Sequence, residues 1–356
     1  MSDNLTILQD DAIELLKDLI ATPSFSKQED QTAAIISGFL GKRGVAFQAV
    51  GNNVLALNKN FDTSKPTLLL NSHHDTVKPN PQYTRDPYLP AIEDGRLYGL
   101  GSNDAGGCLV ALVAVFLYYY DRQDLKYNVV LAATAEEEIS GTGGIELTLP
   151  HLPAIDCAIV GEPTQMQMAV AERGLMVLDC TSHGKAGHAA RNEGENAIYK
   201  ALKDIEWFKT YQFDKVSPLL GPSKMTVTVV ETENKAHNVV PAVCRFVVDT
   251  RINELYTFEE VTEIIRSHVE CEIKPRSTRL RSTSIAADHP LVKAGLSLGR
   301  TCYGSPTTSD KALMPFPALK IGPGDSARSH TADEYIFVDE IREGISLYIN
   351  LLNQVI

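Results

Sequence analysis

Hydrophobic positions recur along the chain at two spacings, one typical of helices and one typical of buried strands. Helical spacing covers residues 5–20, 28–42 and 105–119, and Thr22-Pro23 ends the first of these patterns. Short apolar runs at 54–57, 67–70, 127–133 and 157–160 predict buried strands between the helices. This alternation predicts an α/β domain with a mainly parallel sheet and helices on both faces.

The pattern changes near residue 170. From there the predicted order is strand (175–181), helix (196–210), strand (224–232), strand (243–249) and helix (258–271), with the basic stretch 274–284 as a last strand. This is the element order of a ferredoxin-like α+β sandwich. The α/β pattern returns after about residue 284, with another short core strand at 318–321. We therefore predict a discontinuous domain, 1–168 and 284–356, interrupted by an inserted domain at 169–283.

Charge and composition narrow the classes of partner. The chain has 356 residues, with 33 Lys and Arg against 45 Asp and Glu, and no basic run, so nucleic acid and anionic membranes are poor partners. Residues 1–10 lack the features of a secretory signal, and the apolar run at 109–120 is too short to span a membrane. The six cysteines are scattered without a Cys-x-x-Cys pair, which favours reduced cysteines in a cytoplasmic protein.

Four predicted strands are followed by histidines or acidic residues. These are His73, the run Glu136-Glu137-Glu138, Glu162 and His330. Ligands of open α/β sheets bind outside the carboxyl ends of the strands, so we expect these groups to meet at one edge of the sheet. Asp104 joins them at the start of the helix predicted at 105–119.

Carboxylates crowded at one edge repel each other unless cations neutralise them. A mixed set of nitrogen and oxygen ligands suits zinc, with cobalt or manganese as substitutes. Five ligands exceed the needs of one tetrahedral site with an open position, whereas two metals that share a carboxylate use all five. Singly, each group has another interpretation: an ordinary histidine, a helix start, a turn, or an N-cap at Asp104.

Five segments, in the same order over nearly the whole chain, resemble the acetylornithine deacetylase and succinyl-diaminopimelate desuccinylase family of di-zinc aminoacylases and peptidases. They are Ser72-His-His-Asp-Thr-Val77, Gly99-Leu-Gly-Ser-Asn-Asp-Ala-Gly-Gly107, Thr134-Ala-Glu-Glu-Glu138, Gly161-Glu-Pro-Thr164 and Ser329-His-Thr-Ala-Asp-Glu334. The resemblance implies two zinc ions per subunit. His73 and Glu162 would bind one of them, Glu138 and His330 the other, and Asp104 would bridge them.

The same resemblance implies roles for two further acids. Asp75 would hold the second imidazole nitrogen of His73 and so select its tautomer. Glu137 would be the general base, which takes a proton from a metal-bridging water and passes it to the leaving amine. Family members usually have Asp where Glu136 stands, which leaves open an assignment shifted by one residue along Glu136, Glu137 and Glu138.

The inserted domain also resembles the family, through Gly184-Lys-Ala-Gly-His-Ala-Ala190. This segment implies a homodimer formed through the inserted domain, with His188 stabilising the tetrahedral oxyanion from the partner subunit. Asn238 and Arg251 resemble positions that hold the substrate carboxylate, for which the bidentate geometry of Arg is suited. Arg173 is a candidate of the same kind.

Two cationic residues could affect which acyl group the protein accepts. Lys311 and Arg328 are expected near the site, where they could contact an acidic acyl chain such as succinyl or the substrate's α-carboxylate. Alternatively, they pair with Asp310 and Asp325 and contact no substrate.

Together these features predict a metal-dependent amidohydrolase that deacylates a small N-acyl amino acid. By family analogy, N-acetylornithine in arginine biosynthesis is the first choice of substrate. Related N-acyl-ornithines and N-acyl-citrullines belong to the same expected class. The alternatives within hydrolases are a succinyl-diaminopimelate desuccinylase, an N-acetyl-lysine deacetylase and a dipeptidase. An alternative of another class is a non-catalytic metal or amino-acid binding protein, which would not need Glu137 as a base.

Overall fold

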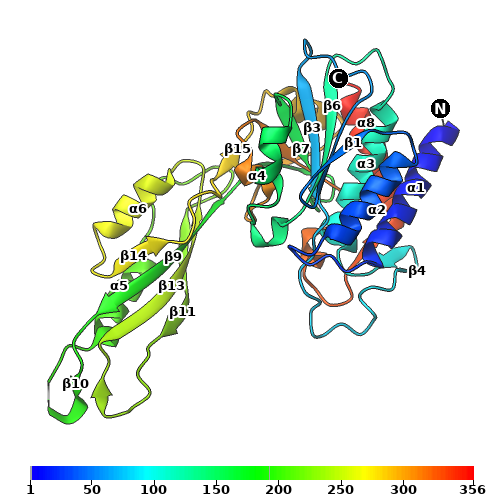
Figure 1. Ribbon diagram of the computed structural model, residues 1–356. Helices are drawn as coiled ribbons and strands as arrows, with labels where there is room; N and C mark the ends of the chain where they lie inside the picture. Colours follow the sequence, from blue (N-terminus) through cyan, green and yellow to red (C-terminus); the bar gives the residue numbers. More distant parts are fainter. Residues whose placement is uncertain (1, 192) are drawn as a thin grey trace. The chain divides into compact units, whose positions relative to one another are not determined.

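The computed structural model describes residues 2–191 and 193–356, which divide into two compact units (Figure 1). The first unit comprises the chain up to Val170 together with Ile285–Tyr303 and Ser309–Ile356. The second comprises Ala171–Ser284 and Gly304–Thr308. The short segment Gly304–Thr308, placed with residues 284–356 in the division from sequence, thus belongs to the second unit.

The central sheet of the first unit has the strand order β1-β2-β6-β3-β7-β17-β8. Its four middle strands are parallel, whereas β1, β2 and β8 pair antiparallel. The strands are β1 (Phe47–Val50), β2 (Asn53–Leu57), β3 (Thr67–His73), β6 (Asn128–Thr134), β7 (Cys157–Val160), β8 (Met168–Glu172) and β17 (Ala318–Lys320). The prediction of an α/β fold with a mainly parallel sheet is confirmed.

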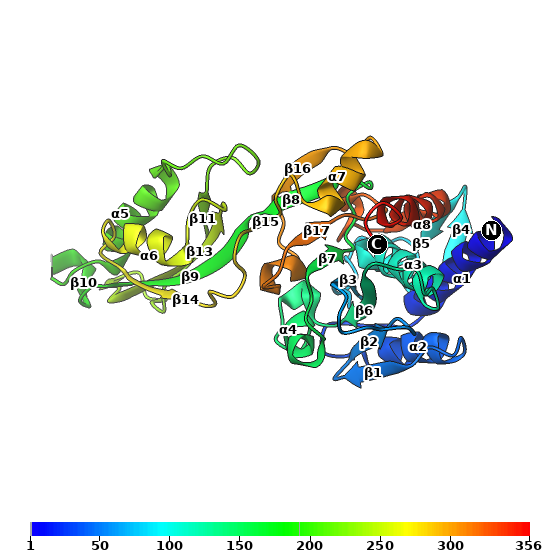
Figure 2. The same ribbon diagram turned by 90° about the horizontal axis from the view of Figure 1, so that it is seen from above.

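Helices cover both faces of this sheet. Side chains alternate along a strand, so Leu68 and Leu70 of β3 join one hydrophobic core and Leu69 joins the other. The first core is formed with α1 (Ser2–Ile20), α2 (Asp30–Gly41), α3 (Gly107–Tyr119), α7 (Pro290–Ser297) and α8 (Val338–Leu352). Figures 1 and 2 show the short helix α4 (Ile145–Thr148) on the opposite side of the sheet from α1 and α3.

Helix α3 is the central helix of the first core. Residues Ser102–Tyr119 are long and apolar enough to cross a membrane, but 83% of this segment is buried inside the protein. A helix that is apolar on every side is expected in the core of a large domain. Its preceding turn, η1 (Ser102–Gly106), carries Asp104.

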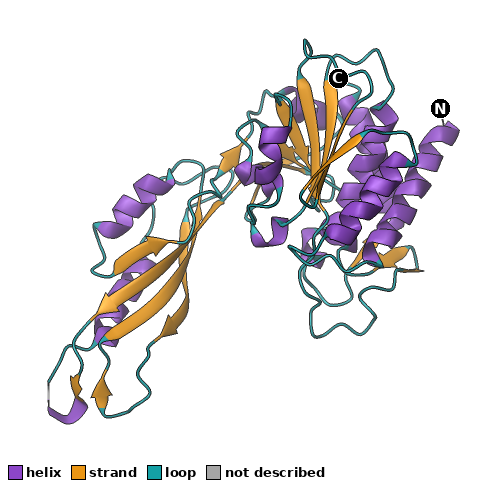
Figure 3. Ribbon diagram, in the orientation of Figure 1, coloured by secondary structure: helices purple, strands orange, loops and turns teal. Residues whose placement is uncertain are grey.

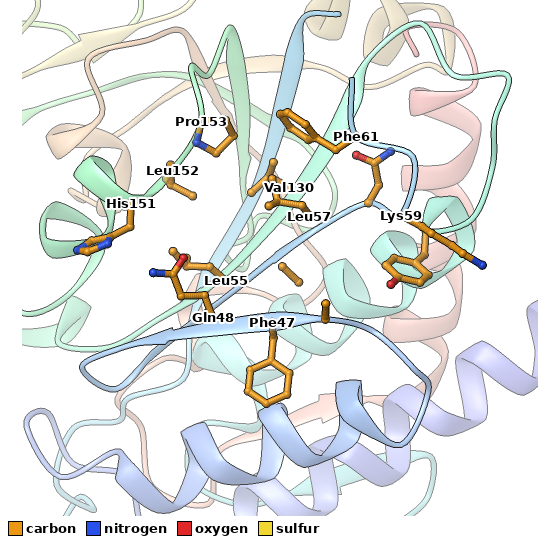
Figure 4. Close-up of a pocket in the computed structure, with 14 residues that line it drawn as sticks. Phe47, Gln48, Leu55, Leu57, Lys59, Phe61, Val130, His151, Leu152 and Pro153 are labelled. Carbon is orange, nitrogen blue, oxygen red and sulfur yellow. The ribbon is translucent and has the colours of Figure 1, made fainter. Parts of the chain in front are cut away.

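The face of the sheet that α4 covers is partly open. A pocket of about 420 Å³ lies there beside β1 and β2, with Phe47, Leu57, Phe61 and Leu152 among its lining residues (Figure 4). None of the residues that line this pocket is a candidate site residue. The pocket is therefore separate from the candidate chemistry described below.

The second unit contains a four-stranded antiparallel sheet in the order β11-β13-β9-β14, with two helices (Figure 3). Every second residue of β9 is buried, and one hydrophobic core joins this face to both helices. The elements are β9 (Gly174–His183), β10 (Gly187–His188), α5 (Ala197–Thr210), β11 (Lys224–Glu231), β12 (Val239–Val240), β13 (Val243–Ile252), α6 (Phe258–Arg266) and β14 (Glu272–Pro275). This is the predicted ferredoxin-like element order.

Two predicted boundaries in the second unit are wrong. Helix α6 ends at Arg266 instead of residue 271, and the N–H groups of Glu270 and Cys271 donate to Asp204 of α5 at 3.1 and 3.0 Å. The stretch 274–284 is not one strand. Strand β14 ends at Pro275, which has no N–H to donate, and β15 (Thr283–Ser284) pairs with β8 instead.

Several short elements carried no clear pattern in the sequence. A small separate sheet has the order β18-β5-β4, formed by Tyr335–Phe337, Arg96–Tyr98 and Ala91–Glu93. Strand β16 (Cys302–Ser305) pairs with β8, and three-residue turns of helix follow β6 and β17, namely η2 (Glu137–Ile139) and η6 (Ser326–Arg328). The remaining short helices are η3 (Leu149–His151), η4 (Ala189–Arg191) and η5 (Asp310–Leu313).

Candidate metal centre

The candidate ligands follow four neighbouring parallel strands. His73 is the last residue of β3, and in the register of the sheet it lies opposite Thr134, the last residue of β6. Glu162 comes two residues after the end of β7, and His330 lies in the loop that follows β17. Because these strands point the same way, their carboxyl ends bring the side chains to one edge of the sheet.

The first part of the centre surrounds His73. Its Nε2 lies 3.5 Å from Oδ1 of Asp104, 3.9 Å from Oε2 of Glu137 and 4.0 Å from Oε1 of Glu162. The imidazole is buried, and Nε2 has no hydrogen-bond partner. A buried nitrogen without a partner is costly, so this atom points to a missing electrophile such as a metal ion.

The second part surrounds His330, whose Nε2 lies 3.0 Å from Oε2 of Glu138 and 3.5 Å from Oδ2 of Asp104. Asp104 therefore turns one carboxylate oxygen toward His73 and the other toward His330. That is the arrangement expected of a carboxylate that bridges two metal ions.

The donor set fits divalent metal ions. Ligand atoms of His73, Asp104 and Glu138 lie within 4.8 Å of one another, and so do those of His73, Glu137 and Glu162. Burial raises the pKa of Glu137 well above its usual value; the charge of His73 opposes this shift, and the nearby Glu162 adds to it. Cations would relieve this crowding of carboxylates. Distance alone does not separate Glu137 from the ligands.

The three consecutive glutamates point in different directions. Glu136 has a left-handed backbone (φ 55°), and its Oε2 accepts the N–H of Gly143 at 3.2 Å. A Cβ on Gly141 or Gly143 would lie 2.0 or 2.3 Å from its carboxylate oxygens, so a side chain at either position would displace this carboxylate. Glu136 is held in this glycine loop, whereas Glu137 and Glu138 face the histidines. This geometry favours the assignment without a shift.

Asp75 contacts both His73 and the glutamate turn. The His73 Nδ1 lies 3.0 Å from the backbone oxygen of Asp75 and 3.4 Å from its Oδ1. The carboxylate also accepts the N–H groups of Glu137 and Glu138 at 3.0 and 3.2 Å, and the hydroxyl of Ser26 at 2.7 Å. Burial favours the protonated acid, but the hydrogen bond and charge of His73 outweigh it, and the pKa of Asp75 is lowered.

Two residues that the sequence analysis did not single out hold the loop of Asp104. The buried Glu334 accepts the N–H groups of Gly101, Asn103 and Asp104 at 3.2, 2.8 and 2.9 Å. Burial, followed by the charge of Asp104, raises the pKa of Glu334 to about 8. Asn103 in turn binds the backbone of Asp325, in the loop that carries His330. Both residues lie inside the segments that resemble the family. That position is the one feature of the sequence that could have identified them.

The two cations predicted near the site, Arg328 and Lys311, both have contacts within the protein. The two terminal guanidinium nitrogens of Arg328, Nη1 and Nη2, donate to the carboxylate of Glu340, at 2.8 and 2.6 Å. The alternative pairing with Asp325 is therefore wrong. Lys311 is 1% exposed, and its Nζ lies 3.5 Å from the backbone oxygen of Ala169.

Asp310, the other expected partner, is buried beside the end of β6. Its Oδ2 accepts the hydroxyl of Thr134 at 2.7 Å. Burial raises the pKa of Asp310 to about 6. A carboxyl group at this position supports the end of β6, from which the glutamate turn begins.

The remaining candidates belong to the second unit. His188 and Asn238 are exposed, and the Nδ1 of His188 accepts the N–H of Ala190 at 3.2 Å. Arg251 forms an ion pair with Asp249, at 2.8 Å. Arg173 donates from Nη2 to the backbone oxygen of Leu220. This hydrogen bond leaves Nε2 of His188 as the ring nitrogen that can donate.

Comparison with known proteins identifies relatives along the whole chain. Succinyl-diaminopimelate desuccinylase 2 of Ruegeria sp. is 25% identical over 96% of this chain and 94% of its own length. Among solved structures, an M20 family metallo-carboxypeptidase from Sulfolobus solfataricus superposes with a TM-score of 0.75 at 21% identity, covering 99% of both chains. A dinuclear metal binding M20 peptidase from Bacillus subtilis gives 0.73 at 15% identity, covering 97% of this chain and 98% of its own.

The family profile described as peptidase family M20/M25/M40 matches residues 69–354. That range begins within β3 and includes all five candidate metal ligands. This match agrees with the fold and with the histidines and carboxylates at the edge of the sheet. The chain belongs to peptidase family M20/M25/M40.

Proposed function

We propose that the protein is a two-zinc hydrolase that cleaves the amide bond of an N-acyl amino acid. The observation that carries this proposal is the carboxylate of Asp104, which faces His73 with one oxygen and His330 with the other, at 3.5 Å each. His73, Asp104 and Glu162 would hold one ion, and Glu138 and His330, with Asp104, the other. A set of imidazole and carboxylate ligands is typical of zinc, and cobalt or manganese could substitute.

When bound, the ions would polarise the acyl carbonyl and lower the pKa of a water molecule. The protein's own contribution is proton transfer at Glu137. Its carboxylate lies beside His73, and its backbone N–H is bound to Asp75, which holds the backbone of Glu137 next to the candidate ligands. From there Glu137 would accept a proton from the attacking water and return it to the leaving amine.

The relatives and the sequence both support a proposal for the substrate class. The sequence motifs favour N-acetylornithine, and the relative from Ruegeria is named a succinyl-diaminopimelate desuccinylase. Both substrates are N-acyl derivatives of a diamino acid, so we propose that class. Arg328, which is bound to Glu340, and the buried Lys311 stay the candidates for binding a succinyl carboxylate.

A substrate panel tests this proposal. The zinc-loaded protein would be offered N-acetylornithine, N-acetylcitrulline, N-succinylornithine, N-acetyl-lysine, succinyl-diaminopimelate and dipeptides, with amine release as the readout. We expect the highest kcat/KM for an N-acyl diamino acid, and no turnover after removal of the metal with a chelator. A preference for dipeptides would defeat the deacylase proposal, and zinc binding without any turnover would favour a binding protein.

The substrate contacts proposed in the second unit are Asn238, Arg251 and Arg173 for the carboxylate, and His188 for the oxyanion. The hydrogen bond from Ala190 to Nδ1 of His188 leaves Nε2 as the donor, which is what oxyanion stabilisation requires.

We also propose a homodimer formed through the second unit. Strand β11 is at the edge of its sheet, and Val229 and Val230 on it are 46% and 55% exposed. An exposed apolar edge strand is suited to pairing with another chain. Light scattering is expected to give the mass of a dimer for the native protein and of a monomer for Val230→Lys. A native monomer at micromolar concentration would contradict this proposal.

A further inference from the structure

Three consecutive backbone N–H groups support the glutamate turn, and all three donate to buried carboxylates. The N–H of Glu136 lies 3.3 Å from Oε1 of Glu29. Those of Glu137 and Glu138 donate to the two oxygens of Asp75, at 3.0 and 3.2 Å. Two acids, Glu29 and Asp75, thus bind the backbone of the turn that carries the proposed base and a proposed ligand. Of the two, only Asp75 lies in a segment that resembles the family.

Burial and hydrogen bonds fix the side chain of Glu29 at this position. Its side chain is 0% exposed, and it accepts the N–H of Lys27 at 2.6 Å and the side-chain amide of Asn52 at 2.8 Å. Glu29 stands at the N-cap position of α2, yet its side chain caps no N–H of that helix. A helix-capping role therefore does not explain the residue. Its contacts are with the loops beside the metal centre.

The turn needs this support because of its backbone. Glu136 has φ 55°, a left-handed conformation that residues other than glycine adopt rarely and at some cost. Its carboxylate is bound to the Gly143 N–H and its own N–H to Glu29, so the residue is held at both ends. Without the Glu29 contact, Glu136 would lose one of the hydrogen bonds that hold it directly before Glu137 and Glu138.

We propose that Glu29 is a positioning residue, which acts through the N–H of Glu136 to aim Glu137 and Glu138 at the metal centre. The inference deepens the proposed function and rests on it for the roles of Glu137 and Glu138. Groups that orient metal ligands typically change affinity or activity by about 10–100-fold when they are removed.

The test is a zinc titration of the metal-free protein by calorimetry, with a thermal melt of each variant. We expect Glu29→Ala to weaken one of the two zinc sites by about tenfold or more and, on the best substrate, to lower kcat by about 10–100-fold with KM unchanged. Glu29→Gln keeps an acceptor oxygen for Glu136 and is expected to recover affinity and kcat to within about threefold of the native values.

Asp30→Asn is the matched control. Asp30 is exposed in the first turn of α2, and its replacement by Asn removes one negative charge from the same region as Glu29→Ala does. It is expected to leave both zinc sites and kcat unchanged. Asn52→Asp supplies a second variant, should Glu29→Ala fail to fold. It places a carboxylate against Glu29 from a partly exposed position and should weaken zinc binding in the same direction.

Zinc affinity separates this inference from the proposed function. Native zinc affinity in a folded Glu29→Ala protein, or equal losses in Glu29→Ala and Asp30→Asn, would overturn the positioning role. If the native protein binds two zinc ions but hydrolyses no N-acyl amino acid, the proposed function fails, and the zinc titrations still decide the role of Glu29.

Discussion

Glu137→Gln is expected to lower kcat by about 10²–10⁴-fold while both zinc ions stay bound, because the change removes the proposed base and keeps its size. The carboxylate lies 3.9 Å from Nε2 of His73, within reach of a water held at the centre. The glutamine would keep the backbone N–H bond to Asp75, so Glu138 should keep its place. Steady-state kinetics and zinc analysis on the same preparation check both halves of the expectation.

Glu136→Gln is the matched comparison for this experiment. Its side chain is bound to the N–H of Gly143 within the glycine loop, and glutamine can still accept that bond. We expect kcat within about threefold of the native value, as for an ordinary replacement of one acceptor by another. An inactive Glu136→Gln protein together with zinc loss in Glu137→Gln would show that the roles are shifted by one residue.

Asp104→Asn is expected to have the largest effect on metal content. Its two oxygens face different histidines, so replacing one of them by an amide NH₂ group removes the shared ligand of both sites. Affinity should fall by more than about 100-fold, since residues that only orient ligands already account for 10–100-fold. Mass spectrometry of metals after dialysis should give less than one zinc per chain, and turnover should be undetectable.

Glu162→Gln is the contrasting variant for Asp104→Asn. Glu162 lies on the His73 side of the centre, 4.0 Å from that imidazole. Its replacement should weaken one site and leave the ion held by Glu138 and His330 in place. Retention of two zinc ions by Asp104→Asn would contradict its role as a bridge.

The edge of the sheet that carries the centre could be predicted from the sequence because its signals are local. The apolar runs before Glu162 and around 128–134 are short and continuous, as buried parallel strands are. Strand β3 extends three residues beyond the predicted run, because Asn71, Ser72 and His73 still pair with β6. Asn71 and Ser72 are polar but buried, and their side chains form hydrogen bonds. A pattern of apolar residues cannot detect such an extension.

The supporting contacts could not be predicted in this way. Glu29 and Glu136 are 107 residues apart, and Glu334 and Asp104 are 230 residues apart. In each case a carboxylate binds backbone N–H groups, which every residue except proline offers, so no pattern of side chains marks the partner. Arg328 illustrates the same limit. Its nearest acids in the sequence suggested Asp325, whereas packing of the loop against α8 brings it to Glu340.

Anomalous diffraction at the zinc absorption edge, from crystals of the zinc-loaded protein, tests the central claim most directly. Two peaks are predicted. One should lie about 2.0–2.2 Å from His73 and Glu162, the other at the same distance from Glu138 and His330, and Asp104 should be bound to both. A single peak, or a peak bound to Glu136 in place of Glu138, would contradict the account.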